Sequence, residues 1–301
     1  MSKYKKIWII TASVLVVIGI VVFSLAMQIN RWDFSALNTY ETEINTYDIS
    51  EEISNINIDT DTADIYFVKS QDNVCKVVCN EYKKIKHTVT VNEGTLTVKS
   101  VDTRKWQDYI AVVAKSPKIT VFLPKEEYAL LTVKESTGDI KVPRNFKFLS
   151  ADISLSTGDV EFSASAEKTV KIELSTGDIE VENTLCDMLD LTVSTGEIEI
   201  SDTVCTNLIS SGSTGDISLE NVNVKEKISI KRSTGEVEFE DSDASEIFVK
   251  TTTGDVTGTL LTDKIFIAES SSGYINVPRT AVGGKCEITT STGDITIRIG
   301  R

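Results

Sequence analysis

Residues able to do chemistry recur at near-constant spacing in the second half of this sequence. In eight places an acidic residue directly follows a glycine, and six of the eight are aspartate. These six are Asp139, Asp159, Asp178, Asp216, Asp255 and Asp294. If successive copies stack, their carboxylates lie about one strand spacing, ~4.8 Å, apart. Hard oxygen ligands in series suit Ca²⁺, so one interpretation is a metal-binding ladder.

The other interpretation of these acidic residues is structural. An aspartate beside a turn accepts hydrogen bonds from nearby backbone N–H groups, and it recurs wherever the turn recurs. Glu197 and Glu236 take the position twice and Tyr274 takes it once, changes that a fixed metal cage tolerates poorly. The Gly-Gly-x-Gly-x-Asp nonapeptide of calcium-binding β-rolls does not occur. We therefore favour the turn role and predict no metal and no cofactor.

Cys186 and Cys205 are the informative pair among the five cysteines. They are 19 residues apart, and each follows one of the repeated glycines by nine residues. In stacked copies their Cα atoms come within about 5 Å, a separation that permits a disulfide. A location outside the cytoplasm would allow the bond, and two buried thiols are the equal alternative. We interpret Cys75, Cys79 and Cys286 as structural.

Side chains typical of enzyme active sites are scarce. The chain has one histidine, His87, which we predict to lie exposed at a strand end. A single histidine disfavours His-rich metal sites and a Ser-His-Asp triad. No Gly-x-Ser-x-Gly elbow, His-Glu-x-x-His helix or phosphate-binding glycine loop occurs. We predict no catalytic residues and a non-enzymatic protein.

The architecture that positions these residues is indicated by the glycines. Nine of them recur at steps of 19 or 20 residues. They are Gly138, Gly158, Gly177, Gly196, Gly215, Gly235, Gly254, Gly273 and Gly293. A regular repeat of about 20 residues is typical of a solenoid, in which each coil packs on its neighbours. Glycine supplies the positive φ that such a turn requires.

Each repeat carries two short apolar patterns of period two. Ile179 and Val181 follow one glycine by two and four residues, and Leu189, Leu191 and Val193 alternate before the next glycine. Period two with β-branched residues predicts strands with one buried face. The fold class is therefore all-β, a single β-solenoid of 19 to 20 residues per coil.

An uncharged apolar segment at residues 7–27 precedes the repeats. Its 21 residues would span roughly 31 Å as a helix, which matches a bilayer core. Lys3, Lys5 and Lys6 precede it, which places residues 1–6 in the cytoplasm and the bulk of the chain outside. A cleaved signal peptide with a site near Ser24-Leu25-Ala26 is the alternative, although the apolar region exceeds the usual length. We predict a retained single-pass transmembrane helix.

The rest of the chain divides into three segments. Residues 28–50 show no period and are predicted to be a juxtamembrane stalk. Residues 51–135 are expected to form an irregular β cap and the first coils, with Ala63 where glycine later stands. Residues 136–301 form the repeat array, with Ile295–Ile299 as its last strand and Arg298 and Arg301 protecting that edge by charge.

Charge is concentrated in the array. Residues 136–301 carry 28 acidic against 15 basic residues, whereas residues 1–135 carry 17 against 16. Nucleic-acid binding needs a basic surface, so we predict no nucleic-acid partner. The oligomeric state is not indicated by the sequence.

These motifs resemble a known family. The segment Ile119–Pro124, the strand Leu131–Val133 and the following Ser-Thr-Gly-Asp-Ile coils look like the bacterial β-strand-repeat family of unknown function labelled putative adhesins. The resemblance covers roughly residues 50–301. It implies a β-solenoid exposed outside the cell envelope, with some relatives linked to envelope-stress operons of Gram-positive bacteria. It offers no catalytic residues.

Two functions follow from the sequence. The first is a surface module or adhesin, anchored by the helix, that presents an acidic face to cell wall, matrix or a membrane protein. The second is a membrane-anchored regulatory component of an envelope-stress signalling system, in which the helix contacts a signalling partner. An ectodomain detached from its anchor would keep the first function and lose the second.

Overall fold

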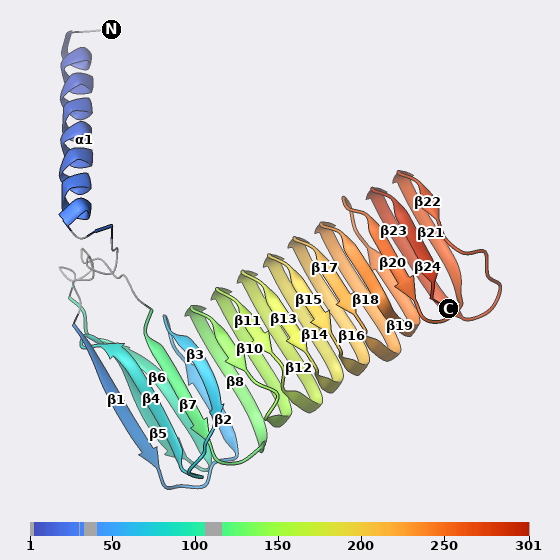
Figure 1. The fold of residues 1–301 in the computed structure, drawn as a ribbon, viewed down its shortest axis with the longest axis horizontal. Coiled ribbons are helices and arrows are strands. Elements are labelled where there is room, and N and C mark those ends of the chain that lie inside the picture. The colour runs from blue at the N-terminus through green and yellow to red at the C-terminus, as the bar shows by residue number, and fades with distance from the viewer. Residues whose placement is uncertain (1–2, 30, 33–40, 106–115, 301) are drawn as a thin grey trace.

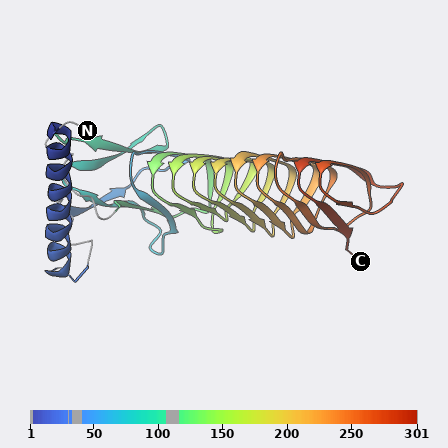
Figure 2. The ribbon, with the colours of Figure 1, turned by 90° about the horizontal axis from the view of Figure 1, so that it is seen from above.

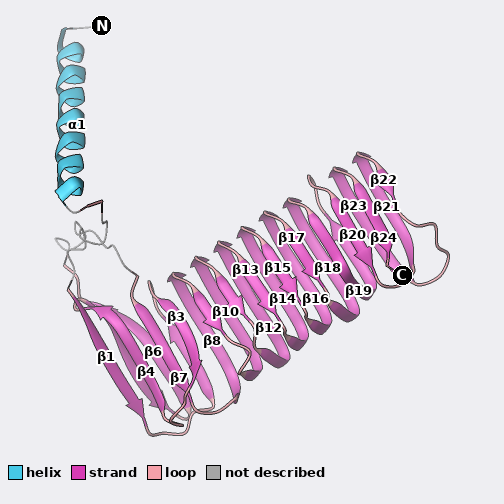
Figure 3. Cartoon of the chain, viewed as in Figure 1, coloured by secondary structure: helices cyan, strands magenta, loops and turns pink. Residues whose placement is uncertain are grey.

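The computed structural model describes residues 3–29, 31–32, 41–105 and 116–300, which form one helix and 24 strands (Figures 1 and 3). The strands wind around a common axis, and their coils stack as one column (Figure 2). Helix α1 (Lys3–Ile29) is long and apolar enough to cross a membrane, with a mean hydropathy of 2.8, a criterion that a signal sequence also meets. The predicted all-β solenoid preceded by one helix is confirmed.

The regular coils contain one long and one short strand each. The long strands are β8 (Glu127–Thr137), β10 (Lys147–Thr157), β12 (Ser165–Thr176), β14 (Leu185–Thr195), β16 (Val204–Thr214) and β18 (Asn223–Thr234). The short strands are β9 (Ile140–Val142), β11 (Val160–Phe162), β13 (Ile179–Glu182), β15 (Ile198–Ser201) and β17 (Ile217–Glu220). Each strand pairs in parallel with its equivalent one coil away, so Ile179 lies between Val160 and Ile198.

The core is a series of apolar layers between the wall of long strands and the wall of short strands. Leu189, Leu191 and Val193 of β14 are fully buried, and the residues between them face outward. Burying one such aliphatic side chain contributes roughly 1.5–3 kcal/mol. Because no coil covers its own apolar side, this stabilisation depends on the coils above and below.

The repeated glycines make the closest contacts between coils. Eight of the nine have φ between +125° and +147°, and a Cβ added there would lie 1.9–2.1 Å from a backbone carbonyl oxygen of the adjacent coil. Gly273 differs, because its φ is not in this range, but an added Cβ would still lie 1.9 Å from the oxygen of Gly293. Ala63 occupies the equivalent place in the first coil, directly below Gly138.

The N-terminal end is less regular. Its strands are β1 (Thr42–Ile49), β2 (Asn55–Asp59), β3 (Asp64–Lys69), β4 (Cys75–Tyr82), β5 (Ile85–Asn92), β6 (Thr95–Asp102) and β7 (Lys118–Leu123). β2 and β3 stack directly on β8 and β9, and β6 and β7 lie outside them. β4 then runs antiparallel to β7, and β1 runs antiparallel to β4.

The stalk predicted for residues 28–50 is wrong for residues 42–49, which form β1. The inward-facing side chains of this strand include Glu43, Asn45 and Tyr47, whereas Ile44 points outward and is 69% exposed. The usual apolar period is therefore absent from the sequence. Polar partners on β4 and β5 explain why these half-buried side chains face inward, as described below.

The last coils stack out of sequence order. Their strands are β19 (Val237–Lys250), β20 (Val256–Leu260), β21 (Lys264–Ser272), β22 (Ile275–Asn276), β23 (Gly284–Thr292) and β24 (Ile295–Ile299). β19 pairs with β23 and β20 pairs with β24, so the last coil of the sequence lies between its two predecessors. β21 and β22 form the terminal coil at the far end (Figure 1).

This order corrects the predicted last edge in part. Ile295–Ile299 pairs along its whole length with β20, and β22 covers Ile295 and Thr296 on its other side. No described strand pairs with the outer side of residues 297–299, so protection of that edge by Arg298 stays a prediction; Arg301 lies outside the described residues. A buried ion pair holds the chain where it passes over the inserted coil, because Lys264 Nζ lies 2.6 Å from Asp243 Oδ1 with the lysine side chain 2% exposed. Gly284 opens the inserted coil where an added Cβ would lie 1.7 Å from the oxygen of Ser245.

Candidate functional site

The predicted carboxylate ladder lies along one exposed edge of the stack. Each aspartate uses Oδ1 to accept the N–H of the residue at the same position in the next coil. The distance from the backbone nitrogen to Oδ1 is 3.1 Å from Asp159 to Asp139 and 2.9 Å from Asp178 to Asp159. It is 2.7 Å from the nitrogen of Asp294 to Oδ1 of Asp255. The carboxylates are thus hydrogen-bonded between coils, which ties the turns together along the axis.

Tyr274 occurs at the one position where such a carboxylate has no function. Its own N–H donates to Asp294 Oδ1 at 2.7 Å, so the ladder reaches the terminal coil. Beyond that coil, the described residues offer no further N–H group at this position. An acid in place of Tyr274 would therefore have no backbone N–H group of a further coil to accept.

The glutamates interrupt the ladder. Glu197 and Glu236 donate their own N–H groups to Asp178 and Asp216. Their carboxylates accept no N–H group from the next coil among the described residues, where the N–H groups would be those of Asp216 and Asp255. The hydrogen bonds fit the turn role favoured from the sequence, and the absence of metal from the ladder stays a prediction.

Cys186 and Cys205 lie opposite each other on β14 and β16. Both are free thiols. The hydrogen bond between them raises the pKa of Cys186, and burial raises it further. The disulfide stays a prediction. Cys75 and Cys286 are also buried, and burial raises the pKa of each thiol, to about 11 and about 12.

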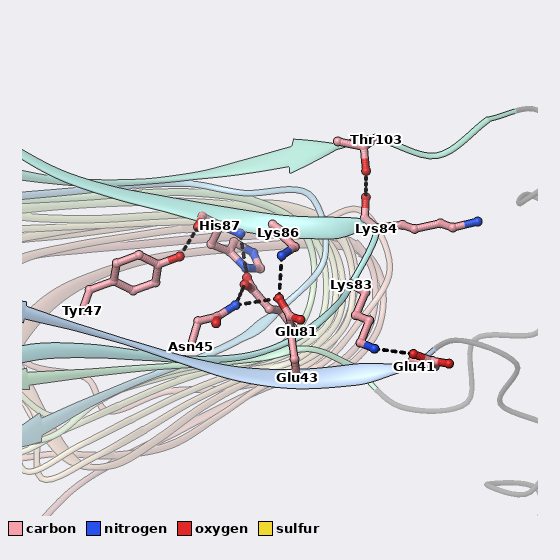
Figure 4. Close-up of polar contacts among 10 residues, drawn as sticks. All are labelled: Glu41, Glu43, Asn45, Tyr47, Glu81, Lys83, Lys84, Lys86, His87 and Thr103. Carbon is pink, nitrogen blue, oxygen red and sulfur yellow. Dashed lines mark hydrogen bonds and ion pairs between the residues drawn. The ribbon is translucent and has the colours of Figure 1, made fainter.

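A buried polar group lies beneath β1 at the N-terminal end (Figure 4). Glu81 of β4 accepts a hydrogen bond from Asn45 Nδ2 at 2.6 Å on one carboxylate oxygen. Its other oxygen lies 2.6 Å from the backbone nitrogen of His87 and 2.7 Å from His87 Nδ1. Tyr47 donates to the carbonyl oxygen of His87 at 2.8 Å, which joins β1 to β5.

His87 was predicted to be exposed, and that prediction is wrong. The residue is 2% exposed, because β1 covers the face of the sheet that contains it. Burial, followed by the nearby charge of Glu81, raises the pKa of Cys79 to about 12. Lys86 and Glu43 form an ion pair of 2.7 Å at the margin of this group.

Cys79, Glu81 and His87 are the one set of three or more His, Cys, Asp and Glu ligand atoms that come within 4.8 Å of one another in the described residues. We call them the β4–β5 cluster. The sequence analysis missed this cluster because the residues that cover it belong to the segment interpreted as a stalk. The spacing of Cys79 and Glu81, two apart on one strand, was the available signal.

The terminal coil has a free edge at the end opposite β1. β21 pairs with β23 and, within the described residues, with no strand on its other side. Phe266 and Ala268 pack against the core yet remain partly exposed, and Ile265, Ile267 and Tyr274 are exposed. Apolar side chains and unpaired backbone groups therefore coincide there.

A family model described as Toastrack DUF4097 matches residues 53–208 and 187–301. The chain belongs to the Toastrack DUF4097 family. No curated protein matches the sequence. Two overlapping matches thus account for nearly all of the solenoid of this Toastrack DUF4097 protein.

Solved structures resemble this Toastrack DUF4097 protein at low identity. A putative adhesin from Parabacteroides distasonis is 11% identical with a TM-score of 0.47, covering 86% of this chain and 98% of the other. A putative adhesin from Bacteroides fragilis is 16% identical with a TM-score of 0.45, covering 86% and 97%. A putative lipid binding protein from P. distasonis is 16% identical with a TM-score of 0.43, covering 85% and 97%.

Proposed function

We propose that this protein is a non-enzymatic surface module, anchored in the cell membrane by α1, that binds an envelope protein through its terminal coil. The bulk of the chain lies outside the cytoplasm. The observation that carries the proposal is the free edge of β21, which lies at the end of the solenoid opposite the strands that follow the anchor (Figure 1).

Charge favours the terminal coil over the sides as the contact surface. Residues 136–260 carry 24 acidic against 10 basic residues, whereas residues 261–301 carry 4 against 5. The acidic sides repel acidic surfaces and keep neighbouring copies apart. The near-neutral terminal coil lacks that repulsion, so contact occurs there at the lowest electrostatic cost.

The partner that fits this edge is an extended segment of a protein. An added strand would satisfy the unpaired N–H and C=O groups of β21, and its side chains would cover Ile265 and Ile267. Covering Phe266 and Ala268 would complete the last layer of the core. Strand addition of this kind takes affinity from the backbone and specificity from alternate side chains.

An edge-blocking substitution tests the proposal. Ile267→Lys places a charge on the free edge, and Ile209→Lys is the matched control because Ile209 is 40% exposed on β16, which is paired on both sides. Each full-length variant is crosslinked in cells to its envelope partners. Loss of the crosslinked partner with Ile267→Lys alone supports the proposal, and retention with both variants contradicts it.

Hydrogen exchange then locates the contact. Binding of the partner should slow exchange of the β21 amides that face outward and leave the β14 and β16 amides unchanged. The regulatory role is the alternative outcome. In that case release of the ectodomain from α1 would abolish a signalling response while the terminal coil would gain no protection.

A further inference from the structure

We infer that Cys79, Glu81 and His87 of the β4–β5 cluster bind one Zn²⁺ ion. A thiol sulfur, a carboxylate oxygen and an imidazole nitrogen lie within 4.8 Å of one another, and the three residues are 0%, 1% and 2% exposed. Thiolate, imidazole and carboxylate are the three ligand types that proteins use for zinc. Atoms bonded to one tetrahedral zinc at about 2.0–2.3 Å lie roughly 3.3–3.8 Å from one another, so binding would draw these three ligand atoms closer together.

An unsatisfied ring nitrogen supports a ligand at this place. His87 Nδ1 contacts Glu81, whereas Nε2 is buried and has no hydrogen-bond partner. A buried polar atom without a partner is destabilising. A metal bound by Nε2 would give this nitrogen the partner that it lacks.

The charge of the bound site favours a divalent ion. Glu81 brings a carboxylate into the buried group, and Lys86 at the margin of the group is paired with Glu43 at 2.7 Å. On binding, Zn²⁺ takes the sulfur lone pair as the Cys79 S–H bond releases its proton to solvent. It also accepts a lone pair from His87 and one from Glu81. Two anionic ligands and one neutral ligand then balance the metal, which leaves a neutral site in the interior.

The strands provide both rigidity and access. Cys79 and Glu81 lie two residues apart on one face of β4, and His87 follows on β5 after the connection at residues 83–84. Asn45 and Tyr47 of β1 cover the group. Since β1 pairs with β4 alone among the described strands, its opening exposes the ligands without disturbing the regular coils.

The test uses the full-length chain without an affinity tag, purified in detergent, stripped with a chelator and titrated with Zn²⁺. We expect one zinc per chain by elemental analysis, and at least a tenfold loss of affinity with Cys79→Ser and with His87→Gln. Cys75→Ser is the matched control, because Cys75 is buried on the same face of β4 and lies outside the cluster. It should bind zinc like the wild type.

Cobalt provides a readout that needs no variant. Co²⁺ loading of the wild type should produce a sulfur-to-cobalt charge-transfer band, and Zn²⁺ should displace it. Absence of the band, substoichiometric zinc, or equal losses in Cys79→Ser and Cys75→Ser would each overturn the inference and leave the cluster as an internal hydrogen-bond network.

Discussion

Substitution of one repeat glycine measures how tightly the coils are stacked. In Gly196→Ala the new Cβ lies 1.9 Å from the oxygen and 2.7 Å from the carbonyl carbon of Gly177, at a φ of +145°. The backbone conformation alone costs about 1–3 kcal/mol for a residue other than glycine. The carbonyl oxygen of Gly177 cannot stay in place, so the two coils must separate, which weakens the 3.0 Å bond from the Gly177 nitrogen to the Thr195 oxygen.

Weakening one or two such hydrogen bonds adds roughly 1 kcal/mol each, so we expect Gly196→Ala to destabilise the solenoid by at least about 3 kcal/mol. Gly94→Ala is the matched control. Gly94 has a φ of +71°, but its added Cβ would be no closer than 3.8 Å to any of its neighbours. Only the conformational cost of about 1–2 kcal/mol applies there.

Urea unfolding of both full-length variants in detergent, followed by circular dichroism, provides the comparison. Hydrogen exchange adds the location, since loss of protection should centre on β13 to β16 in Gly196→Ala and on the β5–β6 hairpin in Gly94→Ala. If the two variants lose equal stability, or if Gly196→Ala loses less than about 1 kcal/mol, close stacking at the glycines does not stabilise the array.

Four other predictions follow from the structure. Burial raises the pKa of Glu135 from 4.5 to about 7, so the native state favours the protonated form; stability should fall by on the order of 3 kcal/mol as pH rises from 4.5 through 7, and Glu135→Gln should remove that slope in urea titrations. Lys264→Met leaves the Asp243 carboxylate buried without a cation and should cost roughly 3–5 kcal/mol by chemical unfolding, whereas a change below 1 kcal/mol would show that the pair does not hold the terminal coil. Mass spectrometry without reductant tests the bridge between Cys186 and Cys205, and two free thiols in protein taken from the cell surface would exclude it. Because ladder oxygens accept backbone N–H groups, thermal midpoints in Ca²⁺ and in chelator should agree, and a rise with Ca²⁺ would favour the metal-binding interpretation.

The regular part of the fold was predictable because each coil repeats one local rule. A glycine with positive φ, followed by alternating apolar residues such as Ile179 and Val181, specifies a turn and a half-buried strand without any distant contact. The stacking direction then follows from the need of each coil to cover the next.

The order of the last coils was not predictable from that rule. Coils with equal repeats present similar apolar layers, so the pattern alone does not decide which coil lies next to which. Here the decision depends on the Lys264 pair with Asp243 and on the close approach at Gly284, both of which join segments about 20 to 40 residues apart. A lysine in a strand pattern is expected at the surface.

The β4–β5 cluster was missed for a related reason. Burial of Glu81 and His87 depends on hydrogen bonds across strands that lie 36 to 40 residues apart along the chain, between β1 and the β4–β5 pair. In the sequence, a segment with polar side chains at the inward positions, like β1, has the same pattern as an exposed segment. Their partners become visible only when the antiparallel register of β1 and β4 is known.

The internal position of β23 and β24 has a consequence for biogenesis. Residues 284–299 are made after residues 264–276, yet they form the layer beneath them. A chain arrested before residue 284 therefore lacks the layer that lies between β19–β20 and β21–β22, and its last coil has no surface on which to pack. The outer coil can pack only after residues 284–299 have been made, so a packed outer coil reports that synthesis has passed residue 299.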